Sequence, residues 1–288
     1  MRAERVMTMK LCNFYAGKEI HIGAETPRGL VDLTAAGLGP GMNSVIAAAD
    51  MALPLIASVL AGAELPAVEA PRFANVTEPG KIACVGLNYK SHAEETGGEV
   101  PAEPVIFSKF SDQLCPEGQE IALPPWLRCF DYEAELVIVV GKPCWNVPEE
   151  EAMGHIFGYT VGNDLSARDS QFRSNQWLIG KSLPDFSPAG PWIVTADEFD
   201  PGKSHAVQCR VNGQLVQNGN TNDMIFNCAE ILSYCSRFFS LAPGDLIYTG
   251  TPAGVILGHK KGSRVWLKAG DEVSVSIEGI GTLTNKLV

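Results

Sequence analysis

The sequence lacks a hydrophobic run long enough to cross a membrane, and it is poor in basic residues. Spanning a bilayer takes about 18 to 20 consecutive apolar residues, and no apolar run among these 288 residues approaches that length. Lys and Arg number 22 against 33 Asp and Glu, which gives a net charge of −11. Because nucleic acids and anionic membranes bind basic surfaces, we expect neither a nucleic acid nor a membrane as a partner.

Paired cysteines and clustered histidines are also missing. The eight cysteines stand singly, without a C-x-x-C motif, and the five histidines are equally dispersed. Isolated cysteines in a chain of this length are typical of buried, reduced thiols, not of a disulfide framework or a zinc site. We therefore predict a cytoplasmic protein in which any bound metal has oxygen ligands. The first nine residues lack the apolar core of a signal peptide, and either Met1 or Met9 is the start.

What is present is the composition of a globular protein, with 45% hydrophobic and 19% charged residues. Short runs of mixed polarity over residues 10–35 predict small antiparallel strands. Residues 43–61 predict a helix that Pro54 kinks or divides. The prolines of residues 62–79 indicate a linker, so we place a small N-terminal α+β domain, with its linker, at residues 1–75.

The remaining residues, 76–288, predict the larger domain. Many short strands and few helices follow one another at irregular spacing, which favours a mixed, rolled β-sheet over a βαβ repeat. One helix is expected from Asp164 or Ser166 to about Trp177, and a second over residues 223–239. The predicted fold class is α+β, mostly β.

Three acidic residues stand before a run of five aliphatic ones, in the segment Asp131-Tyr132-Glu133-Ala134-Glu135-Leu136-Val137-Ile138-Val139-Val140. On a strand, residues two apart share a face, so Glu133 and Glu135 point the same way, with Asp131 in phase behind them. A solvated acidic edge strand would explain this pattern. A buried carboxylate cluster, neutralised by protons or by a cation, is the alternative.

Asp164 directly follows the next predicted apolar strand, residues 156–163. An acid at this position commonly caps a helix, but together with Glu133 and Glu135 it makes a three-carboxylate site of the kind that Mg²⁺ or Mn²⁺ prefers. Arg168 and Lys181 follow, and cations beside such a cluster suit an anionic substrate.

The order of five motifs resembles the fumarylacetoacetate hydrolase (FAH) family. The resemblance is strong over about residues 80–288, and the segment from Val211 to Phe226 looks closest to the branch of FAH domain-containing protein 2. The motifs are Gly86-Leu87-Asn88-Tyr89-x-x-His92-x-x-Glu95, Asp131-Tyr132-Glu133-x-Glu135-Leu136, Gly158-Tyr159-Thr160-Val161-Gly162-Asn163-Asp164-x-Ser166-Ala167-Arg168-Asp169, Gly180-Lys181-Ser182-x-x-x-Phe186-x-Pro188, and Gly244-Asp245-Leu246-Ile247-Tyr248-Thr249-Gly250-Thr251-Pro252-Ala253-Gly254-Val255.

The resemblance implies a mixed β-roll catalytic domain, a homodimer and a divalent cation, Mg²⁺ or else Mn²⁺ or Ca²⁺. It also assigns roles to ten residues of this chain. Glu133, Glu135 and Asp164 are the metal ligands, Lys181 contacts a keto or enolate oxygen, Arg168, Gln171, Gly250 and Thr251 bind the substrate, and His92 is a base oriented by Glu95 on a lid. Asp131 falls outside the ligand set, and no acid stands at residues 85–88, where larger members supply a further ligand.

The implied activity is the metal-dependent hydrolysis of a C–C bond in an acylpyruvate-like β-diketo acid, through an enolate that the metal stabilises. Decarboxylation or tautomerisation of oxaloacetate uses the same enolate, as does the isomerisation of an unsaturated dicarboxylic acid, so these remain alternatives. A non-catalytic scaffold that keeps the fold is a third hypothesis. It has no need of Lys181 or His92, and their presence counts against it.

Overall fold

The computed structural model describes residues 9–39, 41–62, 65–97 and 100–288. Of the two candidate start residues, Met1 lies outside the described residues and Met9 is the first of them. Within these ranges, no helix combines the length and the apolarity that crossing a membrane requires.

A large mixed sheet of nine strands, counted over the described residues, runs through the molecule. Strand β9 lies inside this sheet, next to the middle strand β10, and pairs with β10 on one side and with β16 on the other. In spatial order the strands are β3 (Gly29–Asp32), β2 (Glu19–Thr26), β1 (Lys10–Ala16), β13 (Ile193–Thr195), β10 (Ile156–Asn163), β9 (Ala134–Val140), β16 (Leu246–Tyr248), β4 (Ile82–Gly86) and β5 (Val105–Lys109).

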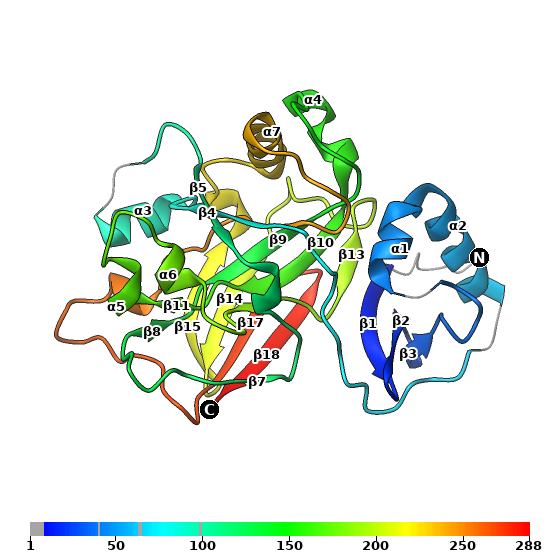
Figure 1. The fold of residues 1–288 in the computed structure, drawn as a ribbon, viewed down its shortest axis with the longest axis horizontal. Coiled ribbons are helices and arrows are strands. Elements are labelled where there is room, and N and C mark those ends of the chain that lie inside the picture. The colour runs from blue at the N-terminus through cyan, green and yellow to red at the C-terminus, as the bar shows by residue number, and fades with distance from the viewer. Residues whose placement is uncertain (1–8, 40, 63–64, 98–99) are drawn as a thin grey trace.

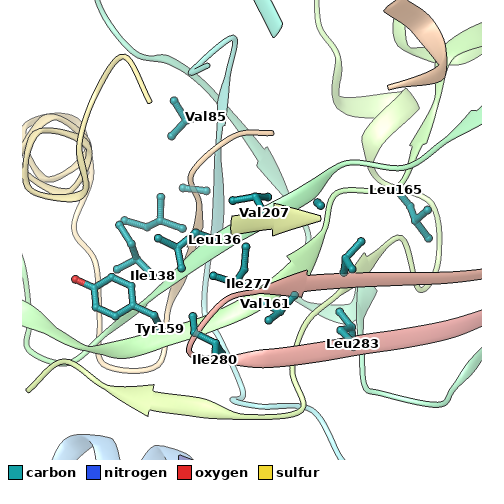
Figure 2. Close-up of a cluster of buried hydrophobic side chains, with 14 of the residues drawn as sticks. Val85, Leu136, Ile138, Tyr159, Val161, Leu165, Val207, Ile277, Ile280 and Leu283 are labelled. Atoms are coloured by element: carbon teal, nitrogen blue, oxygen red, sulfur yellow. The ribbon is translucent and has the colours of Figure 1, made fainter. Parts of the chain in front are cut away.

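A second sheet of five strands packs against the middle of the first. Its order is β15 (Gln214–Asn220), β14 (Ala206–Val211), β17 (Glu272–Ile277), β18 (Gly281–Leu287) and β7 (Glu120–Ile121). Figure 2 shows the core between the sheets, where Leu136 and Val161 of the first sheet lie close to Val207, Ile277 and Leu283 of the second. Two short pairs complete the strands: β8 (Phe130–Asp131) with β11 (Ser166–Ala167), and β6 (Leu114–Cys115) with β12 (Ser187–Pro188).

The buried centre of the fold explains why β9 is apolar throughout. All seven of its residues are buried. Leu136 and Ile138 face the second sheet, while Val137 and Val139 belong to a separate cluster that includes the N-terminal strands and helices. A strand buried on both faces has no solvated side on which to place its acids, which excludes the acidic edge strand.

The N-terminal segment is continuous with the large sheet, because β1 pairs antiparallel with β13. Figure 1 shows its strands and its helices α1 (Met42–Ala47) and α2 (Ala49–Gly62) at one end of the molecule. The opposite end carries α3 (Lys90–Thr96), α5 (Arg168–Gln171) and α6 (Leu178–Lys181). The boundary at residue 75 stays a prediction, to which the structure adds that one sheet spans both segments.

The α+β fold class and the abundance of strands are confirmed, whereas the helix predictions need correction. The chain breaks between α1 and α2 at Ala48, while Pro54 lies inside α2 with its side chain exposed. No helix runs from Asp164 to Trp177, and neither Asp164 nor Ser166 caps one, since β11 and the short α5 occupy that segment. The helix expected at residues 223–239 is α7 (Cys228–Phe238), capped by Asn227, and the remaining helix is α4 (Glu149–Ala152).

Candidate active site

Antiparallel pairing of β9 with β10 brings the three predicted metal ligands together. Glu135 lies opposite Gly162 in this register, and the N–H of Asp164, just beyond β10, donates to the carbonyl of Glu133 at 2.9 Å. One oxygen from each of Glu133, Glu135 and Asp164 lies within 4.8 Å of the other two, and all three side chains are buried. The expectation of a strand over Glu133 is only partly right, because this residue lies between β8 and β9.

Two buried lysines and one buried arginine hold the carboxylates in place. Lys181 Nζ lies 2.6 Å from Glu133 Oε2 and 2.7 Å from Asp164 Oδ2. Lys109 Nζ lies 2.5 Å from Asp164 Oδ1 and also donates to the carbonyl of Phe186. Removing such charges from water is costly unless they are paired, so each cation fixes the geometry of the acid that it contacts.

Arg168 connects Glu133 to Asp131. Its Nη2 lies 2.7 Å from Glu133 Oε1 and its Nε lies 2.9 Å from Asp131 Oδ2. The remaining amino group, Nη1, donates to Gln171 Oε1 at 2.9 Å. The guanidinium group is thus oriented at three points before a substrate arrives.

The carboxyl groups differ sharply in how well their charge is balanced. Burial raises the pKa of Glu133, but Lys181 and Arg168 outweigh it and lower the pKa to about 2. For Glu135, burial and the neighbouring charges of Asp164 and Glu133 raise the pKa well above its ordinary value. Within the described residues no cation lies within ion-pair distance of Glu135, whose Oε2 accepts one hydrogen bond, from Gly250 N–H at 2.7 Å.

This donor set fits a hard divalent cation. Glu133, Glu135 and Asp164 supply three buried carboxylates that converge on one point, and Mg²⁺ and Mn²⁺ bind such oxygens with water or substrate completing the shell. The uncompensated charge of Glu135 is what a cation would neutralise. The residues present therefore fit a divalent metal ion.

Asp131 organises the segment that closes the site. Its Oδ1 accepts from the N–H of Ile256 and its Oδ2 from the N–H of Leu257, both at 2.9 Å. These residues belong to the 3₁₀ turn η4 (Ile256–Gly258). Since Oδ2 also binds Arg168, one carboxylate joins this arginine to the turn.

The His92–Glu95 pair lies on α3, above the same turn. His92 Nδ1 lies 3.7 Å from Glu95 Oε2, and Gly254 N–H donates to Glu95 at 3.0 Å. Partial burial raises the pKa of Glu95, but the nearby imidazole of His92 and the hydrogen bond from Gly254 N–H outweigh it and lower the pKa. Glu95 packs directly against Gly258. A side chain at residue 258 would collide with it, because a Cβ there would lie 2.1 Å from Glu95 Cδ.

Gly250 and Thr251 follow β16 and lie beside Glu135 and Ala134, but their polar groups already have partners. Gly250 N–H donates to Glu135, and the Thr251 hydroxyl donates to the carbonyl of Ala134 and accepts from Gln217 Nε2, each at 2.9 Å. Gly250 has a φ of 99°, and a Cβ there would lie 2.8 Å from Asn88 Cβ. The Thr251 hydroxyl must therefore reorient before it can donate a hydrogen bond to another group.

A cavity of about 450 Å³ unites these groups. Its polar lining includes eight of the ten predicted site residues: His92, Glu95, Glu133, Glu135, Arg168, Gln171, Lys181 and Thr251. Its apolar walls include Val85, Phe107, Phe172, Trp177 and Leu257. Asp164 and Gly250 lie behind the lining, in contact with Lys181 and Glu135 respectively.

Two residues that hold the site together were missed from the sequence. Lys109 ends the strand β5, and its only signal is that a lysine closes the run Val105-Ile106-Phe107-Ser108. Gln217 lies on β15 of the second sheet and receives the N–H of Ala134 at 2.9 Å, which fixes the backbone between the two glutamates. Nothing in the local sequence of Gln217 indicates this role.

Comparison with known proteins gives a match to the family model described as "Fumarylacetoacetate (FAA) hydrolase C-terminal" over residues 81–288. The chain is 46% identical to the fumarylacetoacetate hydrolase domain-containing protein 2 homolog of Dictyostelium discoideum, covering 73% of this chain and 72% of that one. It is 40% identical to the mitochondrial oxaloacetate tautomerase FAHD2A of Homo sapiens, covering 97% of this chain and 92% of that one.

Solved structures resemble the chain over nearly its whole length. A fumarylacetoacetate hydrolase from the psychrophilic Exiguobacterium antarcticum superposes with a TM-score of 0.82 at 35% identity, covering 97% of this chain and 99% of the other. A 5-carboxymethyl-2-hydroxymuconate delta-isomerase from Mycobacterium smegmatis gives a TM-score of 0.77 at 32% identity, with coverage of 97% and 98%. The N-terminal segment is thus included in the likeness.

Proposed function

Because the chain belongs to the fumarylacetoacetate hydrolase family, whose members are enzymes of small organic acids, we propose that it converts a 2-oxo acid through its enolate with the help of a divalent metal. The observation that carries this proposal is the convergence of three buried carboxylates in a cavity that also holds the His92–Glu95 pair. When bound, the metal would act as a Lewis acid toward the oxygens of the substrate. The predicted homodimer and the cytoplasmic location stay predictions.

The side chains of this chain supply the remaining chemistry. Arg168 and Gln171 are held rigidly at the cavity wall and would orient the substrate carboxylate. Lys181 presents an ammonium group beside the developing enolate oxygen, where positive charge lowers the barrier. His92, aligned by Glu95, would remove or return the proton at carbon, or activate a water for attack. Helix α3, which carries this pair, would exclude bulk water as a lid over the bound substrate.

Two reactions fit this arrangement. Hydrolysis of the C–C bond of an acylpyruvate-like β-diketo acid is the reaction predicted from the sequence, and it is supported by a base that can activate water. Keto–enol tautomerisation of oxaloacetate needs no attacking water, and it is supported by the names of relatives that are 40% identical over 97% of this chain. Both reactions require the same three carboxylates.

The deciding experiment is a substrate panel with the Mg²⁺- and Mn²⁺-loaded protein. Acetylpyruvate should yield acetate and pyruvate if the protein is a hydrolase, and oxaloacetate should show accelerated loss of its enol absorbance if it is a tautomerase. If oxaloacetate alone reacts, and His92→Ala leaves that rate intact, the hydrolase reading fails. If no 2-oxo acid reacts although metal binds, the protein is not an enzyme of this kind.

Metal binding can be tested independently of turnover. The double substitution Glu133→Gln and Glu135→Gln should abolish Mg²⁺ binding in calorimetry, because it removes two of three carboxylate ligands. Glu149→Gln with Glu151→Gln is the matched control, since these acids are also two apart but exposed on α4. Undiminished Mg²⁺ binding in the first variant would place the metal elsewhere.

A further inference from the structure

The cations of the cavity wall are not equally available to a substrate. Arg168 is bound by Asp131 and Glu133, and Lys181 by Glu133 and Asp164. Arg264 also lines this cavity. Over the described residues, no carboxylate lies within ion-pair distance of Arg264, in contrast to the other two. The wall therefore carries one positive charge that its own acids do not neutralise.

The guanidinium group of Arg264 is held at one edge only. Its Nε donates to the carbonyl of His259 at 2.9 Å, and its central carbon lies 5.9 Å from the centre of the Trp266 ring. Neither contact uses the two terminal amino groups. The residue is half-buried, so part of the entropy cost of ordering a long side chain has already been met by the fold.

A carboxylate is the ligand that such a group fits. Two terminal amino groups in one plane match the two oxygens of a carboxylate, and the paired, charge-assisted hydrogen bonds are among the strongest in proteins. The metal ligands and Lys181 serve the 2-oxo acid end of the substrate, so a carboxylate at Arg264 belongs to the other end of the molecule. Apolar side chains, among them Leu257 and Phe172, line the same cavity and suit the carbon chain between.

We propose that Arg264 binds a second, distal carboxylate of the substrate. This inference rests on the proposed function and narrows its substrate class. It makes Arg264 a specificity-determining residue, distinct from Arg168, Gln171 and Thr251. The segment that carries Arg264 begins at η4, the turn against which the lid residue Glu95 packs. Binding at Arg264 and closure of the lid therefore involve one segment.

The test compares substrates that differ in the distal carboxylate alone. Succinylpyruvate and butanoylpyruvate form one matched pair, and oxaloacetate and its 4-ethyl ester form a second. Arg264→Gln should raise KM for the member with the free distal carboxylate by about 10- to 100-fold, as expected for a lost charge-assisted bidentate contact. KM for the other member should change by less than about twofold, and Arg264→Lys should recover part of the loss. Lys261→Gln is the control, because Lys261 is an exposed cation of the same segment.

A binding measurement makes the outcome independent of turnover. Calorimetry with the Mg²⁺-loaded protein should show tighter binding of 2-oxoglutarate than of 2-oxopentanoate, and Arg264→Gln should remove the difference. Equal loss for both members of a pair would mean that Arg264 supports the loop and reads no carboxylate. An unchanged KM and unchanged binding would make it a surface charge. Turnover of monocarboxylic acids alone would overturn the inference and leave the proposed function intact, whereas absent turnover with intact discrimination in binding would do the reverse.

Discussion

Replacing Gly258 with alanine should displace the lid carboxylate and leave the fold in place. A Cβ at residue 258 would lie 2.1 Å from Cδ and 2.5 Å from Oε1 of Glu95, closer than atoms approach in proteins. Because these atoms end a flexible side chain, Glu95 can swing away without movement of the backbone. Gly258 is not among the glycines with positive φ, so alanine is compatible with the conformation of this turn.

The size of the effect follows from the contact that is lost. The displaced carboxylate gives up the N–H of Gly254, now at 3.0 Å, and its position beside His92. A hydrogen bond to a charged group contributes about 1.5–3 kcal/mol. If the transition state loses this amount of stabilisation, kcat/KM falls by about 10- to 100-fold. The free energy of unfolding should change by less than about 1 kcal/mol, because the backbone N–H that loses its partner, that of Gly254, is only partly buried and can bind water instead.

Steady-state kinetics and urea unfolding of the same variants measure the two quantities. Gly262→Ala is the matched control, since Gly262 lies in the same segment and a Cβ there meets no atom within 4 Å. Wild-type kinetics in Gly258→Ala would refute the role given to the lid carboxylate. A loss of activity matched by an equally large loss of stability would show that the turn itself had been disrupted.

Two further substitutions test the charge arrangement. Asp131→Asn should lower the free energy of unfolding by about 3 kcal/mol, because it leaves buried Arg168 with one carboxylate partner; urea unfolding against the exposed control Asp112→Asn measures this, and equal stabilities would contradict it. Burial raises the pKa of Glu117 to about 7 although Thr284 N–H lowers it. The pKa of Glu117 is therefore higher in the folded than in the unfolded state. Its protonated carboxyl group contributes fully to the free energy of unfolding below about pH 4.5, and this contribution is lost as the pH rises through about 7. The difference in the free energy of unfolding between Glu117→Gln and wild type should therefore shift by about 1–2 kcal/mol in favour of the variant from pH 4.5 to pH 8. Urea unfolding at both pH values measures this difference, and a difference that does not change with pH would contradict the prediction.

The acids of the site could be predicted from the sequence because each stands next to an apolar run that forms a strand. Two glutamates two residues apart before an aliphatic run, and an aspartate after the next apolar run, become neighbours once the two strands pair antiparallel. The positions of these acids relative to strand ends are local properties. The burial of β9 on both faces, which excluded a solvated edge, depends on the second sheet and the N-terminal segment and could be read only from the structure.

Contacts across long sequence distances account for what was missed. Lys109 meets Asp164 across 55 residues, and Gln217 meets Ala134 across 83. No periodicity records either pairing. The helix expected up to Trp177 is wrong for a similar reason. Gly180 packs against Gln171, where a Cβ would lie 2.4 Å from the Gln171 Cα, so the chain folds back and forms two short helices in place of one long one.

Pro54 shows the opposite case, in which a strong local signal had a weaker effect than expected. Proline removes one backbone N–H donor and disfavours the helical conformation of the residue before it. In α2 its side chain is exposed, so water can satisfy the carbonyl that loses its partner. The helix continues, and the interruption falls at Ala48, ahead of the proline.

The segment from Gly254 to Arg264 gives the site its unity, because it connects groups that the sequence presents separately. Its first N–H holds Glu95 of the lid, and its middle N–H groups bind Asp131, the carboxylate that also fixes Arg168. Its far end places Arg264 in the same cavity wall. A substrate bound as we propose would meet this segment at two places. One is Arg168, which is joined to the segment through Asp131, and the other is Arg264 itself. With the roles that we propose for these residues, a substrate that lacks the distal carboxylate engages only one of the two ends of this segment.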